Sequence, residues 1–372
     1  MLTSQLRKFN DLYNKFGLGA TKNLHLICQL IILGRTCNLW KLKDYVGLAL
    51  GNTHVQPLSH YQRLIRFFKA YQEDDDFLIA LQQRTLRLLR RFKFTHLLLD
   101  GTSWKRGQQK YHYMVLSVLV GDVALPIYCK QLSKIGASSQ VERQTMFTEA
   151  LQLFDLSGMT LLADREYVGK KWFKYLTDNK INFVIRLRFG DYYEAVDAEK
   201  GKSYQRMYDD CRGAGKFCRK RIELSGCYYY LSMRPNPKAT AGDEVIIFLT
   251  RIKAVKKTVD QYVKRWRIEC LFRHLKSNGF GLEDLNLKPP EKSNLLMALV
   301  GLAYSLTVRT GYEAASRIRR INYRDGTTFP AESIFRKGLS LLTPFCGKIE
   351  HFIDRYLSLD SGQNHWRIIN VE

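Results

Sequence analysis

The sequence predicts an α/β fold: a sheet covered by helices, with helical regions before and after it. Between residues 95 and 189, short apolar runs alternate with segments of helical spacing, as in a sheet with helices on its faces. Outside the sheet-forming segments, apolar residues recur mainly at three- and four-residue intervals. The chain has 372 residues, of which 45% are hydrophobic. This is enough for two or three domains, and it excludes a disordered chain.

The N-terminal region, residues 1–94, is predicted to be helical. Helical spacing is clearest in 24–33, 61–71 and 81–94, and the acidic run 73–76 separates two helices. This region carries fifteen Lys and Arg against six Asp and Glu. The excess favours a DNA-docking module, although a solvated helix face explains any one of these helices equally well.

The catalytic core is predicted at 95–189 and 244–290. The expected strands are 96–100, 111–120, 123–129, 159–164, 182–188 and 244–250, and the expected helices are 141–154, 168–179 and 255–277. Residues 190–243 interrupt this alternation of strands and helices and are rich in Gly, Lys, Arg and Tyr. We interpret them as a β-rich insertion with strands at 217–224 and 227–233. A helical C-terminal region, 291–372, completes the chain, with helices at 294–310 and 347–357.

The charge balance points to a polyanionic partner. Lys and Arg number 59 against 35 Asp and Glu, which gives a net charge of +24. Nucleic acid is the first expectation, and an anionic membrane is the second. The longest apolar runs, 24–33 and 295–306, are short for a bilayer span, and no signal-like segment opens the chain. We therefore expect a soluble cytoplasmic protein.

The cysteines are expected to be reduced thiols, most of them buried. None of the eight forms a C-x-x-C pair. Cys211, Cys218 and Cys227 cluster loosely, but their spacing fits no usual zinc pattern. Zinc binding there is left as a minor alternative.

Two aspartates end apolar strands, Asp100 in LLLDGTSW and Asp164 in LLADREY. Taken singly, each has an ordinary explanation: Asp before Gly is a turn residue, and Asp164 could cap the next helix. Neighbouring strands of a sheet, however, deliver their carboxyl ends to one edge. Together the two carboxylates predict an oxygen-rich site suited to magnesium or manganese.

The segment 255–277 supplies a third carboxylate, Glu269. On a continuous helix, Tyr262, Arg265, Glu269 and Lys276 share an arc of about 60°. This polar stripe is expected to lie between two apolar stripes and to face a cleft. Alternatively, Glu269 only pairs with Arg265 or Arg273 four residues away. The segment 251–276 carries nine basic against two acidic residues, so it attracts phosphate in either case.

These residues carry a resemblance to a known family. Tyr262-x2-Arg265-x3-Glu269-x6-Lys276 resembles the Tyr-Arg-Glu-Lys signature of DDE transposases of bacterial insertion sequences, in the insertion-sequence-four family. The segments around Asp100 and Asp164 look like those around the family's two aspartates. The resemblance runs from about residue 95 to 310. The regions before and after it match the family only in their helical character.

The resemblance implies a ribonuclease-H-like core in which Asp100, Asp164 and Glu269 hold two divalent ions, Mg²⁺ with Mn²⁺ as a substitute. It implies cut-and-paste transposition: nicking at terminal inverted repeats, hairpin formation and resolution, and strand transfer into target DNA. Tyr262, Arg265 and Lys276, with Arg273 and Arg165, would contact DNA phosphates. A flipped base would stack on an aromatic residue. Tyr228, Tyr229 or Tyr230 could serve, although each could equally be a buried strand residue.

Two other functions stay open at this stage. One is a transposase-derived DNA-binding protein without catalysis, and the other is a ribonuclease-H-like nuclease that cuts without joining. The resemblance also implies a bacterial protein associated with the nucleoid through DNA. Because two ends must be joined and one core offers one set of carboxylates, we expect a homodimer in the DNA complex. The apolar runs LLMALVGLAY and IFRKGLSLL either form part of that contact or cover the sheet within one chain.

Overall fold

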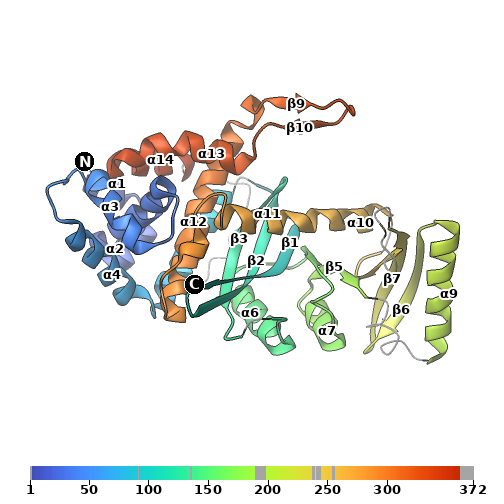
Figure 1. Ribbon diagram of the computed structural model, residues 1–372. Coiled ribbons are helices and arrows are strands. Elements are labelled where there is room, and N and C mark those ends of the chain that lie inside the picture. Colours follow the sequence, from blue (N-terminus) through green and yellow to red (C-terminus); the bar gives the residue numbers. More distant parts are fainter. Residues whose placement is uncertain are drawn as a thin grey trace.

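The structure is a computed structural model that describes residues 2–90, 92–134, 136–188, 198–236, 239, 244–253 and 256–360 (Figure 1). Of the predicted segments, the start of the insertion, parts of 237–243, the start of the helix at 255 and the tail after 360 lie outside these residues.

An eight-stranded sheet runs through the molecule in the order β3-β2-β1-β4-β5-β8-β7-β6. The strands β1, β4 and β5 are parallel, and the other neighbouring pairs are antiparallel. The predicted α/β class is therefore confirmed, and the order of the first five strands is that of the ribonuclease-H-like fold. The strands are β1 (His96–Arg106), β2 (Gln109–Val120), β3 (Val123–Gln131), β4 (Thr160–Ala163), β5 (Asn182–Leu187), β6 (Cys218–Leu224), β7 (Cys227–Pro235) and β8 (Val245–Thr250).

Helices cover both sides of the core strands. In Figure 1, α6 (Gln140–Leu153) and α7 (Lys170–Asp178) lie below the sheet, and α11 (Trp266–Leu275) lies above it, against β1 and β3. The start of α6 is fixed by a capping box in which Ser139 and Glu142 bond each other's backbone N–H groups.

The predicted helix 255–277 is not continuous. It consists of α10 (Lys256–Asp260), the 3₁₀ segment η1 (Gln261–Arg265) and α11, which ends at Leu275. The expected flanking stripes are also partly wrong, because Val263 and Trp266 are exposed, whereas Ile268, Phe272 and Leu275 are buried. One side of the polar face is therefore packed against protein, whereas on the other side Val259 is buried but Val263 and Trp266 are not.

The insertion extends the central sheet. Strands β6 and β7 form a hairpin, and β7 pairs with β8, so the two predicted strands are confirmed. A helix that was not predicted, α9 (Ala198–Ala214), packs against β6, β7 and β8. The insertion is thus mixed in structure.

The N- and C-terminal helices pack together as one helical region. It contains α1 (Leu2–Arg7), α2 (Asn10–Gly34), α3 (Leu39–Leu50), α4 (Pro57–Tyr71), α5 (Asp75–Leu89), α12 (Pro290–Glu313), α13 (Ile334–Leu342) and α14 (Ile349–Asp360). Arg84 of α5, with a side chain only 1% exposed, bonds Asp11 of α2 at 2.9 Å and Asp360 of α14 at 2.8 Å. The same guanidinium lies 4.7 Å from the centre of the Phe9 ring.

The long helix α12 is the centre of this region. Most of its residues are buried, against α2, α5, α13 and β3. The run LLMALVGLAY therefore covers the sheet within the chain, and the dimer-contact interpretation of this run is wrong. By length and composition alone, α2 and α12 could each cross a membrane, but most of their apolar windows lie inside the protein.

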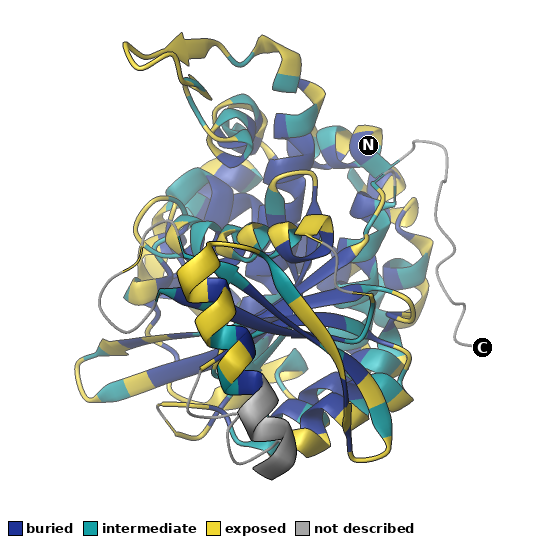
Figure 2. Cartoon of the chain, turned by 90° about the vertical axis from the view of Figure 1, so that its right-hand side faces the viewer, coloured by how far each residue is buried: buried dark blue, intermediate teal, exposed yellow. Residues whose placement is uncertain are grey.

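The helical region also carries a projecting hairpin. Strands β9 (Arg320–Asn322) and β10 (Thr328–Pro330) form a separate two-stranded sheet between the 3₁₀ turn η3 (Ala315–Arg317) and α13. It extends away from the body in Figure 1 and is almost entirely exposed in Figure 2. We did not predict this hairpin from the sequence.

Candidate active site

Two aspartates meet where the parallel part of the sheet ends. The β1–β4 ladder pairs Leu97 with Leu161, Leu98 with Leu162 and finally Leu99 with Ala163. Asp100 and Asp164 follow directly, so both occupy the same register position at one edge. The prediction that the two strands bring these carboxylates together is confirmed.

The predicted turn at Asp100-Gly101 is wrong. Strand β1 continues to Arg106, because β2 remains paired with it and places Val115 opposite Asp100. The Gly101 N–H donates to Asp100 Oδ1 at 2.8 Å, and the Arg165 N–H donates to Asp164 Oδ1 at 2.7 Å. Each carboxylate is thereby oriented by the backbone that follows it.

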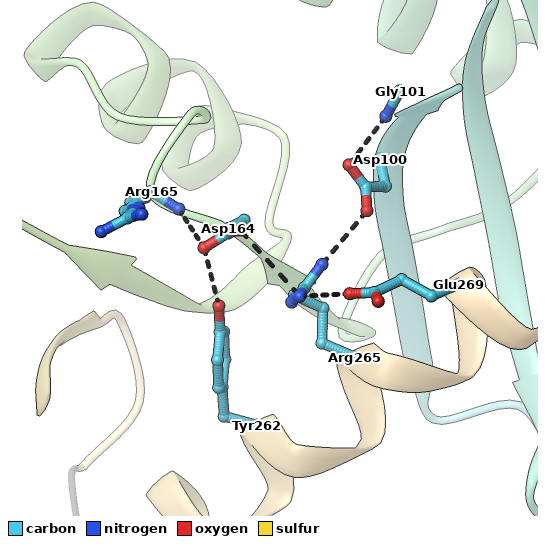
Figure 3. A network of polar contacts seen from close by, with 7 residues as sticks. All are labelled: Asp100, Gly101, Asp164, Arg165, Tyr262, Arg265 and Glu269. Atoms are coloured by element: carbon cyan, nitrogen blue, oxygen red, sulfur yellow. Dashed lines mark hydrogen bonds and ion pairs between the residues drawn. The ribbon is translucent and has the colours of Figure 1, made fainter. Parts of the chain in front are cut away.

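A guanidinium joins these aspartates to the third carboxylate. Arg265 Nη1 lies 3.1 Å from Asp100 Oδ2, and Nη2 lies 2.7 Å from Glu269 Oε1 and 3.9 Å from Asp164 Oδ2 (Figure 3). The Arg265 side chain is 14% exposed, and the three carboxylate side chains are 20% to 33% exposed. The site is therefore sheltered but open to solvent.

The pairing of Glu269 with Arg265 was one of the two alternatives considered from the sequence. The structure contains that pair, whereas Glu269 has no ion pair with Arg273 among the described residues. It also adds the contacts of Arg265 to the two strand aspartates. The pair is thus one part of a bridge between helix and sheet.

The environment of Asp100 disfavours its charge. Burial is the largest cause and raises the pKa of Asp100 from 3.8 to about 6. Arg265 and the Gly101 N–H act in the opposite direction, and the carboxylates of Asp164 and Glu166 raise the pKa further. Asp100 is therefore protonated more readily than an exposed aspartate.

Tyr262 is the second residue of η1 and reaches the same site. Its hydroxyl donates to Asp164 Oδ1 at 3.2 Å, and its ring packs edge-on against Phe248 of β8, with the centroids 4.9 Å apart. Burial, together with the charge of Asp164, raises the pKa of Tyr262, so the hydroxyl stays protonated and can donate. The position of η1 is fixed by a 2.7 Å contact between Gln261 Oε1 and His96 Nε2.

Lys276 lies beside the site rather than in it. It follows the last residue of α11, and its Nζ donates to the Ser103 carbonyl at 2.9 Å and lies 3.7 Å from Glu283 Oε1. Burial lowers the pKa of Lys276. Its ammonium is also 5.6 Å from the centre of the Trp104 ring.

The two other predicted DNA-contacting arginines are solvent-exposed. The Arg165 side chain points away from the three carboxylates in Figure 3, and Arg273 is exposed on α11. Neither forms an ion pair with a described residue. The structure thus gathers Tyr262 and Arg265 with the carboxylates and leaves Lys276, Arg165 and Arg273 outside.

A supporting network behind Asp164 was missed in the sequence. Glu166 Oε1 accepts hydrogen bonds from Ser138 N at 2.9 Å and Ser138 Oγ at 3.1 Å. Arg143 of α6 donates to Ser138 Oγ at 2.9 Å and stacks over the Tyr167 ring. The acidic residue two positions after Asp164 was the only available signal, and its partners are far away in sequence.

The insertion tyrosines differ in exposure. Tyr229 is buried on β7, as the structural interpretation required, whereas Tyr228 is 56% exposed and its ring lies 4.0 Å from Arg221. Tyr230 is half-buried. Of the three, only Tyr228 is exposed, and Arg221 lies over its ring.

The carboxylates fit divalent ions by their chemistry. As they stand, the described residues form no cluster ready to hold a metal, because the Arg265 guanidinium lies between the acidic groups. Three carboxylates nevertheless lie around one cation, each with one oxygen within 3.9 Å of it, and hard oxygen donors are what Mg²⁺ and Mn²⁺ prefer.

The cysteines are free thiols in the described structure. Cys28, Cys37, Cys211 and Cys346 are buried, and the other four are half-buried. This agrees in part with the expectation of buried reduced thiols. Burial raises the pKa of Cys211 to about 11, so its thiol is protonated at neutral pH.

Comparisons with known proteins place this site in context. Residues 91–306 match the family described as "Transposase DDE domain". A solved structure of piggyBac transposase in a synaptic complex with hairpin DNA is similar over 92% of this chain and 71% of that one, with 11% identity and a TM-score of 0.46. A comparison with curated protein sequences gave no match.

Proposed function

The chain belongs to the transposase DDE domain family, and from this premise we propose that it is a metal-dependent DNA transposase that works by cut and paste. The observation that carries the proposal is the convergence of Asp100, Asp164 and Glu269 on the Arg265 guanidinium. Three acidic groups from two strands and a helix, held around one positive charge, are a reasonable ligand set for metal-assisted phosphoryl transfer.

Asp100, Asp164 and Glu269 would hold two divalent ions, Mg²⁺ or Mn²⁺. When bound, such ions activate the attacking oxygen and stabilise the leaving 3′ oxygen in an in-line displacement. The chain's own residues then position the DNA. Arg265 is close enough to exchange its carboxylate partners for a phosphate, and the Tyr262 hydroxyl is a hydrogen-bond donor at the same edge.

The DNA steps proposed are those of the insertion-sequence-four family, supported by the Tyr262, Arg265, Glu269 and Lys276 spacing. A nick at the terminal inverted repeat frees a 3′ hydroxyl, which attacks the opposite strand and leaves a hairpin. The hairpin is hydrolysed, and the ends are joined to target DNA. Lys276, Arg165 and Arg273 lie outside the carboxylate cluster and would contact phosphates further along the duplex.

The working complex would contain two copies of the chain, because each core has one set of carboxylates and two ends must be joined. The apolar faces of α12 and α13 are used inside the chain, so the contact between copies would use another surface. The net charge of +24 supports duplex DNA as the partner and a cytoplasmic protein bound to the bacterial nucleoid.

Labelled DNA carrying the element's ends, incubated with the protein and Mg²⁺, tests this function. Asp100→Ala, Asp164→Ala and Glu269→Ala should each abolish nicking and retain end binding, because binding depends on the basic surface. The exposed Asp178→Ala on α7 is the matched control and should retain activity. Substantial nicking by any of the three site variants would exclude the assignment.

The products also separate the alternatives. Joined ends support the transposase, and cleavage without joining indicates a ribonuclease-H-like nuclease. Binding without cleavage by the wild-type protein indicates a transposase-derived DNA-binding protein. A mass measurement with end DNA tests the dimer, which a joining-competent complex of one chain and two ends would exclude.

A further inference from the structure

The projecting hairpin, residues 319–330, which we name the arm, has two different faces. Ile321 and Phe329 are direct cross-strand partners, and the Tyr323 ring lies 5.8 Å from the Phe329 ring. These three side chains share one face and are 38% to 56% exposed. The opposite face carries three polar residues and one proline, with Arg320 across from Pro330 and Asn322 across from Thr328.

The arm carries positive charges that no described carboxylate neutralises. It carries Arg319, Arg320 and Arg324, and Arg317 lies at its base; all four are exposed. None of them forms an ion pair with a carboxylate in the described part of the chain. The arm's one acidic residue, Asp325, accepts bonds from the N–H and hydroxyl of Thr327 within the turn.

The base of the arm is closed by a backbone hydrogen bond and lies beside α11, the helix that carries Glu269. The Ala331 N–H donates to the Arg319 carbonyl at 2.8 Å, which closes the hairpin. Two residues further on, Ser333 Oγ lies 3.4 Å from His274 Nε2 of α11, and the His274 ring stacks on Phe335. The arm and the carboxylate site are therefore connected through α11.

We propose that the arm is a DNA-binding ribbon that grips the duplex beyond the carboxylate site. A two-stranded ribbon fits the major groove. Backbone bonds join Ala331 to Arg319 and Tyr323 to Thr327, one residue beyond each strand, so each side of the arm has about five extended residues, roughly 16 Å, which is long enough to cross the groove. Unpaired arginines suit phosphates, and Tyr323 and Phe329 provide exposed aromatic surface for contacts with sugars or bases. This inference rests on the proposed function, because it assigns one surface to the same DNA.

Charge favours DNA over a second copy of the chain as the partner that binds the arm. In a twofold contact between identical arms, each arm would bring its own unpaired arginines against those of the other. Association would then bury like charges without compensation, in a chain that already carries +24. Duplex DNA offers the opposite charge along its whole length.

The test is the affinity of the full-length protein for labelled duplex as a function of salt. The variant Arg319→Gln/Arg324→Gln removes two arm charges. The matched control Lys174→Gln/Lys180→Gln removes two exposed charges, one on α7 and one before β5, where the sheet edge lies opposite the carboxylates. Losing two phosphate contacts should reduce the salt slope by about 1.8 and weaken binding roughly 10- to 30-fold at 0.15 M salt. The control should stay within about twofold of wild type.

A second variant keeps the test valid if the glutamine substitutions are too mild. Residues 320–330 can be replaced by Gly-Gly, because the Arg319 and Ala331 backbones are already bonded. The shortened protein should unfold at the wild-type temperature and bind DNA as weakly as the double variant or more weakly. Element ends and unrelated duplex, tested side by side with the double glutamine variant, should lose affinity equally, since the arginine contacts proposed are to phosphates.

The outcomes separate this inference from the proposed function. If the wild-type protein binds and cuts DNA, but the arm variants match the control in affinity and slope, the arm inference is wrong and the function stands. If the arm variants change only the oligomeric mass, the arm is a protein contact, and the inference is likewise wrong. If the wild-type protein shows no affinity for any duplex, the proposed function itself fails.

Discussion

Replacing Arg265 by alanine is expected to strengthen divalent-cation binding by the DNA-free protein. The guanidinium makes close contacts of 2.7 Å to Glu269 and 3.1 Å to Asp100, with Asp164 at 3.9 Å. A hydrogen bond to a charged group contributes about 1.5–3 kcal/mol, and partial exposure reduces this. We take about 2–3 kcal/mol as the cost of moving the guanidinium away. Without that cost, the carboxylates should bind the metal roughly 30- to 150-fold more tightly.

Calorimetric titration with Mn²⁺ near pH 7.5, supported by the electron paramagnetic resonance of free Mn²⁺, measures this affinity without DNA or catalysis. The matched control is Arg267→Ala on the same helix, which removes a 3.2 Å pair with Asp122 away from the site. It should leave the affinity unchanged. Adding Asp100→Asn to the Arg265→Ala protein should reverse the gain. If Arg265→Ala bound Mn²⁺ no more tightly than wild type, the guanidinium would not compete with metal, and the reasoning would be wrong.

Three further predictions concern stability, each measured by chemical denaturation without metal. Because the pKa of Asp100 is raised to about 6, the folding free energy that this residue contributes is complete below about pH 4 and is lost as the pH rises through 6. The stability of Asp100→Asn should therefore increase by about 1 kcal/mol relative to that of the wild type between pH 5 and 7.5. The absence of a relative increase would contradict the pKa shift. Arg84→Ala leaves Asp360 without its ion pair and Asp11 with Arg87 alone, in a largely buried site, and should cost about 3–5 kcal/mol. Arg87→Ala, whose side chain is 40% exposed, should cost less than about 1 kcal/mol. Equal losses for the two arginines would show that burial does not decide the effect. Gly338→Ala would push a methyl group into a carbonyl of α12 and should cost about 1–3 kcal/mol, whereas Gly347→Ala meets open space and should be nearly neutral. A neutral Gly338→Ala would mean that α12 and α13 separate easily.

The meeting of two aspartates could be predicted from sequence because it depends only on local strand ends. Neighbouring parallel strands have their carboxyl ends at the same edge of the sheet, and Asp100 and Asp164 both follow apolar runs. The bridge by Arg265 could not be predicted in the same way. Helical spacing placed it near Glu269, but its contact with Asp100 depends on how closely α11 packs on the sheet.

The errors have similar physical causes. Asp100-Gly101 suggested a turn because the local dipeptide is typical of one, but pairing with β2 keeps it in a strand. The run in α12 was apolar enough for an interface, and only the fold reveals that α2, α5 and α13 already cover it. The arm was missed although Asp325-Gly326 is a recognised hairpin signal, because its strands have only three residues each.

The joining of the first and last helices has a consequence for synthesis of the protein. Arg84 receives one of its two carboxylate partners only from α14, 276 positions later in the chain. During translation, the N-terminal helices therefore cannot complete their packing, and part of their apolar surface stays exposed until α14 has been synthesised. Prematurely terminated products that lack α14 should be recognised by chaperones and proteases as unfinished. The cell would thus remove incomplete copies before they could compete for DNA.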